Sequence, residues 1–190
     1  MQKELEIEFK TLISKKDYQR LIECFNIKNN QFKQINYYFD TPNYDLQKLN
    51  KTIRVRQKSD SYILTLKEKI QSGIVNETHI DIDESFLDLI IKDGFSTQQY
   101  FSYLNYNVIF VTSLINYRIT FKHPFYSGTI FIDQCNYLGY TDYELEYEVS
   151  DIFVGEKEWE KILLDLSIQK KKTLSKSQRV FNKIKKLASI

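Results

Sequence analysis

Charged and apolar side chains alternate along several stretches of this sequence, and this alternation limits the possible folds more than any other feature. In the stretch "ELEIEFK", Glu4, Glu6, Glu8 and Lys10 occupy every second position, with apolar residues between them. A β-strand sends alternate side chains to opposite faces. Two carboxylates about 6.6 Å apart on one face repel by about 2.5 kcal/mol at an effective dielectric constant of about 20. Because glutamate is also a poor strand former, we expect another part of the fold to offset this cost.

The same alternation recurs in five later stretches, each with one charged and one apolar face. The charged faces carry Arg54, Arg56 and Lys58; Lys67 and Lys69; Glu77, His79 and Asp81; Arg118 and Lys122; and Glu144, Glu146 and Glu148. A single strand of this kind is explained by the solvated face of an antiparallel sheet. Like charges on neighbouring positions repel, so clustering by sign in several strands favours a shared interior where acids and bases face each other.

The order of the predicted elements indicates an antiparallel fold. Strands are predicted at residues 4–13, 31–41, 52–58, 61–69, 74–83, 108–122, 128–138 and 140–150, and helices at 14–25, 84–94, 96–104, 156–166 and 175–187. Most connections are too short for parallel crossovers. Eight strands can close into a barrel whose interior holds side chains or one small ligand. We therefore predict a single α+β domain over 1–190, a closed eight-stranded antiparallel β-barrel (a tunnel) with a charged lumen and helices packed outside.

Composition places the chain among cytoplasmic globular proteins. Hydrophobic residues make up 42% and charged residues 27% of the chain, which is ordinary for a soluble domain. The net charge of +2 argues against nucleic acid as a partner. Cys24 and Cys135 are the only cysteines, too few for a secreted disulfide scaffold. The N-terminus is charged from residue 3, and no apolar run approaches the roughly 18 to 20 residues of a transmembrane helix.

A wet interior lined by both signs of charge suits a metal-bridged anion. Carboxylate clusters are typical ligands of hard cations such as Mg²⁺ or Mn²⁺. Clustered arginine and lysine side chains suit phosphate oxygens. A polyphosphate bridged to metal ions satisfies both kinds of side chain at once. The sequence therefore predicts a small-molecule phosphate compound as the ligand and leaves the oligomeric state open.

At this point the residues resemble a known family. Glu6-Ile7-Glu8-Phe9-Lys10 resembles the ExExK signature of the CYTH domain, also called the triphosphate tunnel metalloenzymes. "TIRVR", "LTLKEK", Glu77, Arg118, "FIDQCNYLG" with "YELEYE", and "LSKSQR" follow in the order of that family's later motifs. The resemblance covers nearly the whole chain and is greatest for small single-domain bacterial members.

The resemblance implies a metal-dependent hydrolase that transfers a phosphoryl group of tripolyphosphate, thiamine triphosphate or a nucleoside triphosphate to water, with Mg²⁺ or Mn²⁺ as cofactor. It implies catalytic roles for Glu6, Glu8, Lys10 and Lys176, and metal ligands at Glu6, Glu8, Asp133, Glu144 and Glu146. It implies substrate-binding roles for Lys10, Arg54, Arg56, Lys67, Lys69, Arg118, Lys176 and Arg179.

Several alternatives stay open at the level of sequence. Glu148 extends the second acidic run, so the pair there is Glu144 with Glu146 or Glu146 with Glu148. His79 shares the charged face of Glu77 and could contact a metal ion. The competing functions are a class IV-type adenylyl cyclase, a non-catalytic polyphosphate- or nucleotide-binding module, and an interaction scaffold with a solvated charged sheet.

Overall fold

The computed structural model describes residues 1–25, 27 and 31–188. Its strands are β1 (Gln2–Ile13), β2 (Gln31–Asp40), β3 (Lys51–Lys58), β4 (Ser61–Gln71), β5 (Ile74–Ile82), β6 (Phe95–Ser96), β7 (Asn107–Phe121), β8 (Thr129–Tyr137) and β9 (Tyr140–Val149). Its helices are α1 (Lys15–Cys24), α2 (Asp45–Lys48), α3 (Glu84–Asp93), the 3₁₀ helix η2 (Thr97–Gln99), α4 (Ile152–Asp165) and α5 (Lys176–Ala188).

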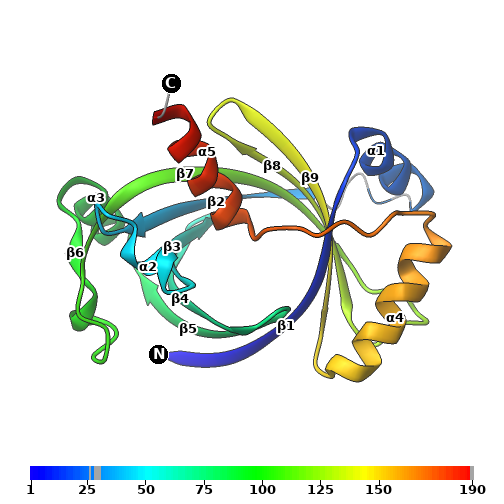
Figure 1. Cartoon of the computed structure of the whole chain (residues 1–190), viewed down its shortest axis with the longest axis horizontal. Coiled ribbons are helices and arrows are strands. Elements are labelled where there is room, and N and C mark those ends of the chain that lie inside the picture. Colours follow the sequence, from blue (N-terminus) through cyan, green and yellow to red (C-terminus); the bar gives the residue numbers. More distant parts are fainter. Residues whose placement is uncertain (26, 28–30, 189–190) are drawn as a thin grey trace. The chain divides into compact units, whose positions relative to one another are not determined.

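The strands form a closed antiparallel sheet. The hydrogen-bonded order is β2-β3-β4-β5-β1-β9-β8-β7-β6, and a further pairing joins β2 to β7 (Figure 1). In the described part of the chain, eight strands therefore form a ring of pairings, and the short β6 pairs with β7. This topology confirms the predicted α+β class with a closed eight-stranded antiparallel sheet.

The chain groups into two compact units, which we describe one at a time. The first unit comprises Met1–Leu5 and Gln34–Leu114, and the second Glu6–Lys33 and Ile115–Ile190. The prediction of a single domain over the whole chain stays a prediction.

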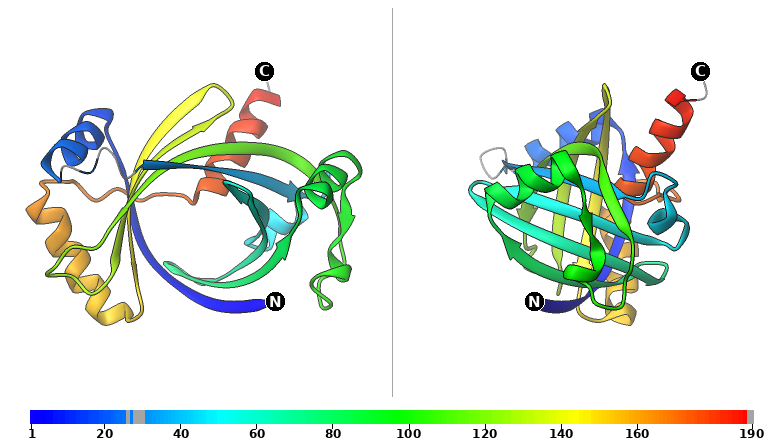
Figure 2. Two further views of the ribbon diagram at one scale, coloured as in Figure 1. Left: turned by 180° about the vertical axis from the view of Figure 1, so that it is seen from behind. Right: turned by 90° about the vertical axis from the view of Figure 1, so that its left-hand side faces the viewer.

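In the first unit, β3, β4 and β5 form a meander (Figure 2). The apolar face of this meander is buried. Val55 and Leu64 are direct cross-strand partners, and neither is exposed to solvent. Leu87 and Ile90 of α3 belong to the same hydrophobic cluster. Burying side chains of this kind contributes about 1.5–3 kcal/mol each, so the apolar parity of these strands fixes which face turns toward the helix.

In the second unit, α1 and α4 pack against β9 (Figure 1). The Ser14 and Asp151 side chains accept hydrogen bonds from the first turns of α1 and α4, respectively, as N-cap residues do. Trp159 of α4 is 1% exposed and stacks on Phe9 of β1. Helix packing therefore covers the apolar face of this part of the sheet and leaves the opposite face to the charged residues.

One predicted helix is wrong. Residues 96–104 were expected to be helical, but they contain the end of β6, the 3₁₀ helix η2 and a turn. The buried Thr97 hydroxyl donates to the Leu104 carbonyl at 2.7 Å and accepts from the Tyr106 backbone N–H at 3.0 Å. Threonine competes with the backbone for such local hydrogen bonds, and here it closes a loop. The 3.6-residue pattern did not reveal this, and it also missed the short helix α2.

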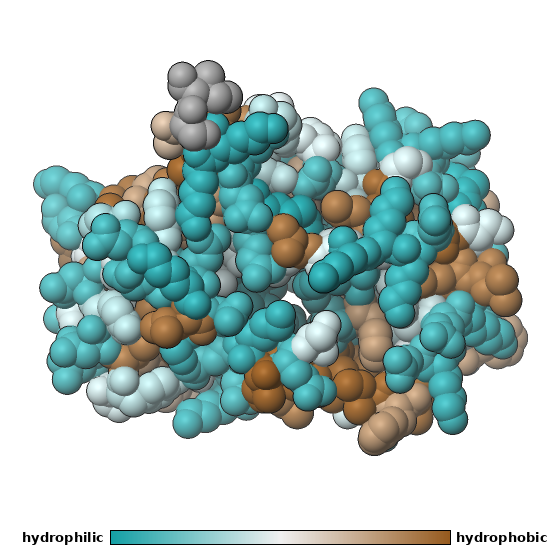
Figure 3. All heavy atoms as spheres, in the orientation of Figure 1, coloured by the Kyte–Doolittle hydropathy of each residue, from teal (hydrophilic) through white to brown (hydrophobic). Residues whose placement is uncertain are grey.

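Polar residues dominate the face of the molecule drawn in Figure 3, and apolar residues form separate patches on it. Among the described residues, no helix is both long and apolar enough to cross a membrane.

We expect Gly94→Ala to destabilise the protein by about 2–4 kcal/mol. Gly94 has a φ of +70° and a ψ of −171°, a conformation that is nearly restricted to glycine, and an added Cβ would lie 2.3 Å from the Val108 carbonyl oxygen. Gly139→Ala is the matched control, because Gly139 has a φ of +77° but no atom within 4 Å of an added Cβ. That control should lose only about 1–2 kcal/mol. Urea unfolding of the two variants measures the difference, and equal losses would contradict the steric argument.

Candidate active site

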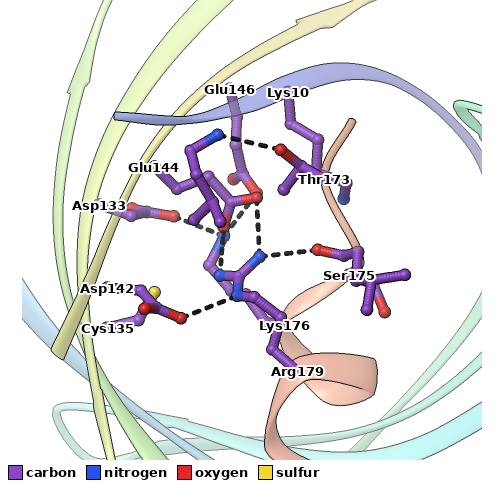
Figure 4. Close-up of polar contacts among 12 residues, drawn as sticks. Lys10, Asp133, Cys135, Asp142, Glu144, Glu146, Thr173, Ser175, Lys176 and Arg179 are labelled. Carbon is purple, nitrogen blue, oxygen red and sulfur yellow. Dashed lines mark hydrogen bonds and ion pairs between the residues drawn. The ribbon is translucent and has the colours of Figure 1, made fainter. Parts of the chain in front are cut away.

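Three buried carboxylates of the second unit gather around a lysine ammonium (Figure 4). Asp133 of β8 lies directly opposite Glu144 of β9. Asp133, Glu144 and Glu146 are 0%, 0% and 2% exposed. The Lys176 Nζ atom lies 2.8 Å from Asp133 Oδ2 and 2.9 Å from Glu144 Oε2, and it also contacts Glu146. Strand parity and register thus bring together acids that are up to 13 residues apart in the sequence.

Arginines complete the neutralisation of this cluster. Arg118 of β7 binds Asp133 through two hydrogen bonds, of 2.8 Å from Nε and 2.6 Å from Nη2, and also contacts Glu146. Arg179 of α5 donates to Glu144 from Nη2 at 2.8 Å. Paired hydrogen bonds between a guanidinium and a carboxylate are among the stronger polar contacts in proteins. The cluster is therefore held by fixed cations from a strand and a helix.

The segment that precedes α5, residues 171–175, is hydrogen-bonded to β1 and positions α5 for these contacts. The Leu12 backbone N–H donates to Thr173 Oγ1 at 3.0 Å, and the Lys171 N–H donates to Thr11 Oγ1 at 2.9 Å. Ser175 then starts the helix, since its carbonyl accepts from the Arg179 N–H at 3.0 Å. These hydrogen bonds hold the segment before α5 against β1, and Lys176 lies in the first turn of α5.

Strand β1 contributes the ExExK residues to the same unit. Lys10 lies opposite Glu146 and Glu8 opposite Glu148 in the pairing of β1 with β9, and the Lys10 ammonium donates to Glu8. Glu6 is half-buried. The structure gathers Glu146 with Glu144 around Lys176. Which pair of acids on β9 binds a metal ion stays a prediction.

The charge distribution shifts the pKa values of these groups in opposite directions. Burial opposes ionisation of Glu146, yet Lys176 and Arg118 outweigh burial and hold the pKa of Glu146 well below its usual range. Burial would lower the pKa of Lys10, but Glu8 and Glu146 raise it above its ordinary value. Burial, with the Glu146 charge second, raises the pKa of Glu8 to about 7. The neighbouring cations thus stabilise the ionised form of Glu8 less than that of Glu146.

The donor set fits a hard divalent cation. All side-chain donors are carboxylate oxygens, the ligand type that Mg²⁺ and Mn²⁺ prefer. Asp133, Glu144 and Glu146 already enclose one cationic centre, the Lys176 ammonium. In the described ranges, no group of three or more His, Cys, Asp or Glu residues is arranged to hold a metal ion. A metal ion and Lys176 would therefore compete for the same oxygens.

The first unit carries a second, smaller charged cluster around Glu77 of β5. Glu77 lies opposite Lys67 of β4 and contacts its ammonium, and Glu77 Oε2 lies 3.8 Å from Arg54 Nη2. The His79 Nε2 atom lies 3.3 Å from Glu77 Oε2 and 3.7 Å from Glu4 Oε2. His79 therefore pairs with acids in this structure, and its predicted contact with a metal ion stays a prediction.

Arg56 and Lys69 complete the predicted residues of this unit. Arg56 is half-buried, and its Nε donates to Asn36 Oδ1 at 3.0 Å. Lys69 is exposed and lies at a register shift near the end of β4. Asn36 was not predicted as a site residue, although the alternation of polar and aromatic residues along β2 gave a signal for it.

The family model for the CYTH domain matches residues 4–181. The chain belongs to the CYTH domain family. The resemblance carried by the ExExK motif and the later motifs is thereby confirmed.

One curated protein and two solved structures illustrate what the chain is similar to. A Bacillus subtilis protein named "Putative triphosphatase YjbK" is 30% identical over 195 residues, which cover 98% of this chain and 99% of that protein. The crystal structure of a protein from Bacillus halodurans, described as a "putative adenylate cyclase", is 28% identical with a TM-score of 0.85, and the match covers 95% of this chain and 100% of that one. A Hippeastrum protein, HpAC1, described with a dominant triphosphatase activity, has a TM-score of 0.74 at 19% identity over 94% and 95% of the two chains.

Proposed function

We propose that this CYTH-family protein is a divalent-metal-dependent triphosphatase that transfers the terminal phosphoryl group of a triphosphate to water. The single observation that carries the proposal is the buried cluster of the second unit, in which three carboxylates and the cations Arg118 and Lys176 lie within hydrogen-bonding distance. Burying this many ionised groups costs several kcal/mol for each ion. Such a cost is expected where the groups serve a charged ligand. The name of the Bacillus subtilis relative supports the same activity.

The carboxylates are the proposed metal ligands. Glu6 and Glu8 of β1, with Asp133, Glu144 and Glu146, would hold Mg²⁺ or Mn²⁺. When bound, such an ion neutralises phosphate oxygens and makes phosphorus more electrophilic.

The bases are the proposed phosphate ligands. In the second unit these are Lys10, Arg118, Lys176 and Arg179. In the first unit they are Arg54, Arg56, Lys67 and the exposed Lys69. Phosphoryl transfer depends mainly on positioning and charge stabilisation. These side chains therefore hold the phosphates and stabilise the negative charge that develops on the diphosphate leaving group. No nucleophilic side chain is needed for this reaction.

A phosphate-release panel tests the proposal. Tripolyphosphate, thiamine triphosphate and ATP are each incubated with the protein and Mg²⁺ or Mn²⁺, and parallel samples contain excess EDTA. We expect phosphate release from at least one substrate and its loss with EDTA. Absence of release from all three, or release that EDTA does not affect, would contradict the assignment.

The second candidate is an adenylyl cyclase, which the 28% identity to the Bacillus halodurans protein favours. Measuring cyclic AMP in the ATP samples separates the two reactions. Cyclisation yields cyclic AMP and pyrophosphate, whereas hydrolysis yields phosphate.

A further inference from the structure

Strand β2 brings an unassigned polar residue to the face of the first unit that carries the arginines. Asn36 lies directly opposite Arg56 of β3, and Tyr38 lies opposite Arg54. Side chains at directly paired positions share one face of a sheet. The alternate residues of β2 face the other way, since Phe39 belongs to the hydrophobic cluster of this unit. Asn36 therefore lies among the predicted phosphate ligands.

The carboxamide of Asn36 is only half satisfied. Asn36 is 0% exposed. Its Oδ1 accepts from Arg56 Nε at 3.0 Å, but its Nδ2 group has no hydrogen-bond partner in the described structure. The buried Nε of Arg54 lacks a partner as well. Buried polar groups are almost always hydrogen-bonded, and an exception needs an explanation. Here two unpartnered N–H donors lie on neighbouring strands next to a second guanidinium.

A purely structural role does not account for this arrangement. Support of Arg56 needs only the Oδ1 atom, so it leaves the buried, unpartnered Nδ2 group unexplained. The unpartnered Asn36 Nδ2 and Arg54 Nε donors, next to the guanidinium of Arg56, instead match the acceptor oxygens of an anion.

We infer that Asn36 is a substrate-binding and positioning residue. Its carbonyl oxygen fixes the guanidinium of Arg56, and its amide N–H₂ donates to a phosphoryl oxygen of the bound triphosphate. Because the amide is neutral, it adds a donor without repelling the neighbouring arginines and without competing with the anion for them. The inference rests on the proposed function, because it takes the anion to be the triphosphate substrate.

Two substitutions of Asn36, to leucine and to aspartate, distinguish anion binding from mere support of Arg56. Asn36→Leu removes both hydrogen-bonding atoms and preserves approximate volume. Asn36→Asp keeps an acceptor for Arg56 Nε but replaces the donor with a negative charge. If Asn36 only supported Arg56, aspartate would be the milder change; if Asn36 binds the anion, aspartate is the more severe one.

Calorimetric titration of tripolyphosphate into the full-length protein in the presence of EDTA tests this inference without turnover. We expect the dissociation constant to rise about tenfold in Asn36→Leu and about a hundredfold in Asn36→Asp, in line with loss of a hydrogen bond to a charged group and with added repulsion. Urea unfolding should show that Asn36→Leu stays folded and loses about 1–3 kcal/mol, because Arg56 Nε loses its acceptor. Asn76→Leu and Asn76→Asp are matched controls, because Asn76 is exposed and next to Glu77 on β5, so that its side chain leaves from the opposite face. Neither control should change the dissociation constant.

Unchanged affinity in both Asn36 variants would overturn the inference, as would a wild-type protein that does not bind tripolyphosphate. A weaker effect of aspartate than of leucine would also overturn it, since that order indicates support of Arg56 alone. If binding depends on Asn36 but no compound of the panel is hydrolysed, only the proposed enzymatic function fails.

Discussion

Replacing Glu8 with glutamine should abolish metal-dependent phosphate release, with a loss of at least about a thousandfold in kcat/KM. The reason is that a proposed metal ligand is lost, and the charge stabilisation supplied by a metal ion amounts to several kcal/mol, or about a thousandfold in rate for 4 kcal/mol. Glu6→Gln should have a comparable effect. Phosphate release with Mg²⁺ or Mn²⁺ measures both losses. Glu148→Gln is the matched control, since Glu148 lies opposite Glu8 in the strand pairing and is not a proposed ligand.

Glu8→Gln should also change how the stability of the metal-free protein depends on pH. Glu8 titrates near pH 7 in the folded protein but near its ordinary value of 4.5 when unfolded. Between these pH values the folded state binds more protons, so the free energy of unfolding decreases as pH rises from about 5 to 8. The decrease due to Glu8 is on the order of 3 kcal/mol. Urea unfolding with EDTA at pH 5 and pH 8 should therefore show a smaller pH dependence in Glu8→Gln than in the wild type.

Two results would contradict this assignment of Glu8. Wild-type activity in both Glu8→Gln and Glu6→Gln would exclude the ExExK carboxylates as metal ligands. A loss of activity in Glu8→Gln that is accompanied by unfolding at pH 7 would show that the carboxylate is structural.

Replacing Lys176 with methionine should lower the free energy of unfolding by about 3–5 kcal/mol in the absence of divalent metal. The ammonium contacts Asp133, Glu144 and Glu146, and removing one partner of a buried ion cluster leaves uncompensated charge. Added Mg²⁺ should restore part of this stability, because a ligand that binds only the folded state stabilises it. Thermal and urea unfolding with EDTA and with Mg²⁺ measure both effects.

Lys183→Met provides the control within the same helix. The Lys183 Nζ atom lies 3.2 Å from the centre of the Tyr140 ring, a cation–π contact worth about 1 kcal/mol. The control should therefore lose little stability and should not respond differently to Mg²⁺. If Lys176→Met were as stable as the wild type without metal, the ammonium would not be the counter-ion of the three acids.

Much of the site could be predicted from strand parity. Glu144, Glu146 and Arg118 occupy alternate positions on strands with apolar opposite faces, and the structure gathers them in one unit. Asp133, which joins them there, was implied only by the family resemblance. Asn36 escaped prediction because an uncharged side chain between Ile35 and Tyr37 gives a weak signal. The role that we infer for Asn36 depends on its unpartnered Nδ2 atom, which only the tertiary structure reveals.

Short helices and loops were less predictable than strands. The stretch 96–104 has helical spacing of apolar residues, yet the buried Thr97 side chain closes a loop there. Such a hydrogen bond depends on tertiary burial, so a pattern of hydrophobicity does not reveal it.

The sequence by itself determined which face of each strand carries charge, because the side-chain period of a strand is two residues and needs no knowledge of its neighbours. Only the tertiary structure decided which acid meets which base. That choice depends on the register between strands and on the return of the chain before α5, and a one-residue slip would move every side chain to the other face. Lys176 shows the difference, because it lies 30 residues beyond Glu146 in the sequence. Its ammonium reaches the three carboxylates because hydrogen bonds hold the segment before α5 against β1.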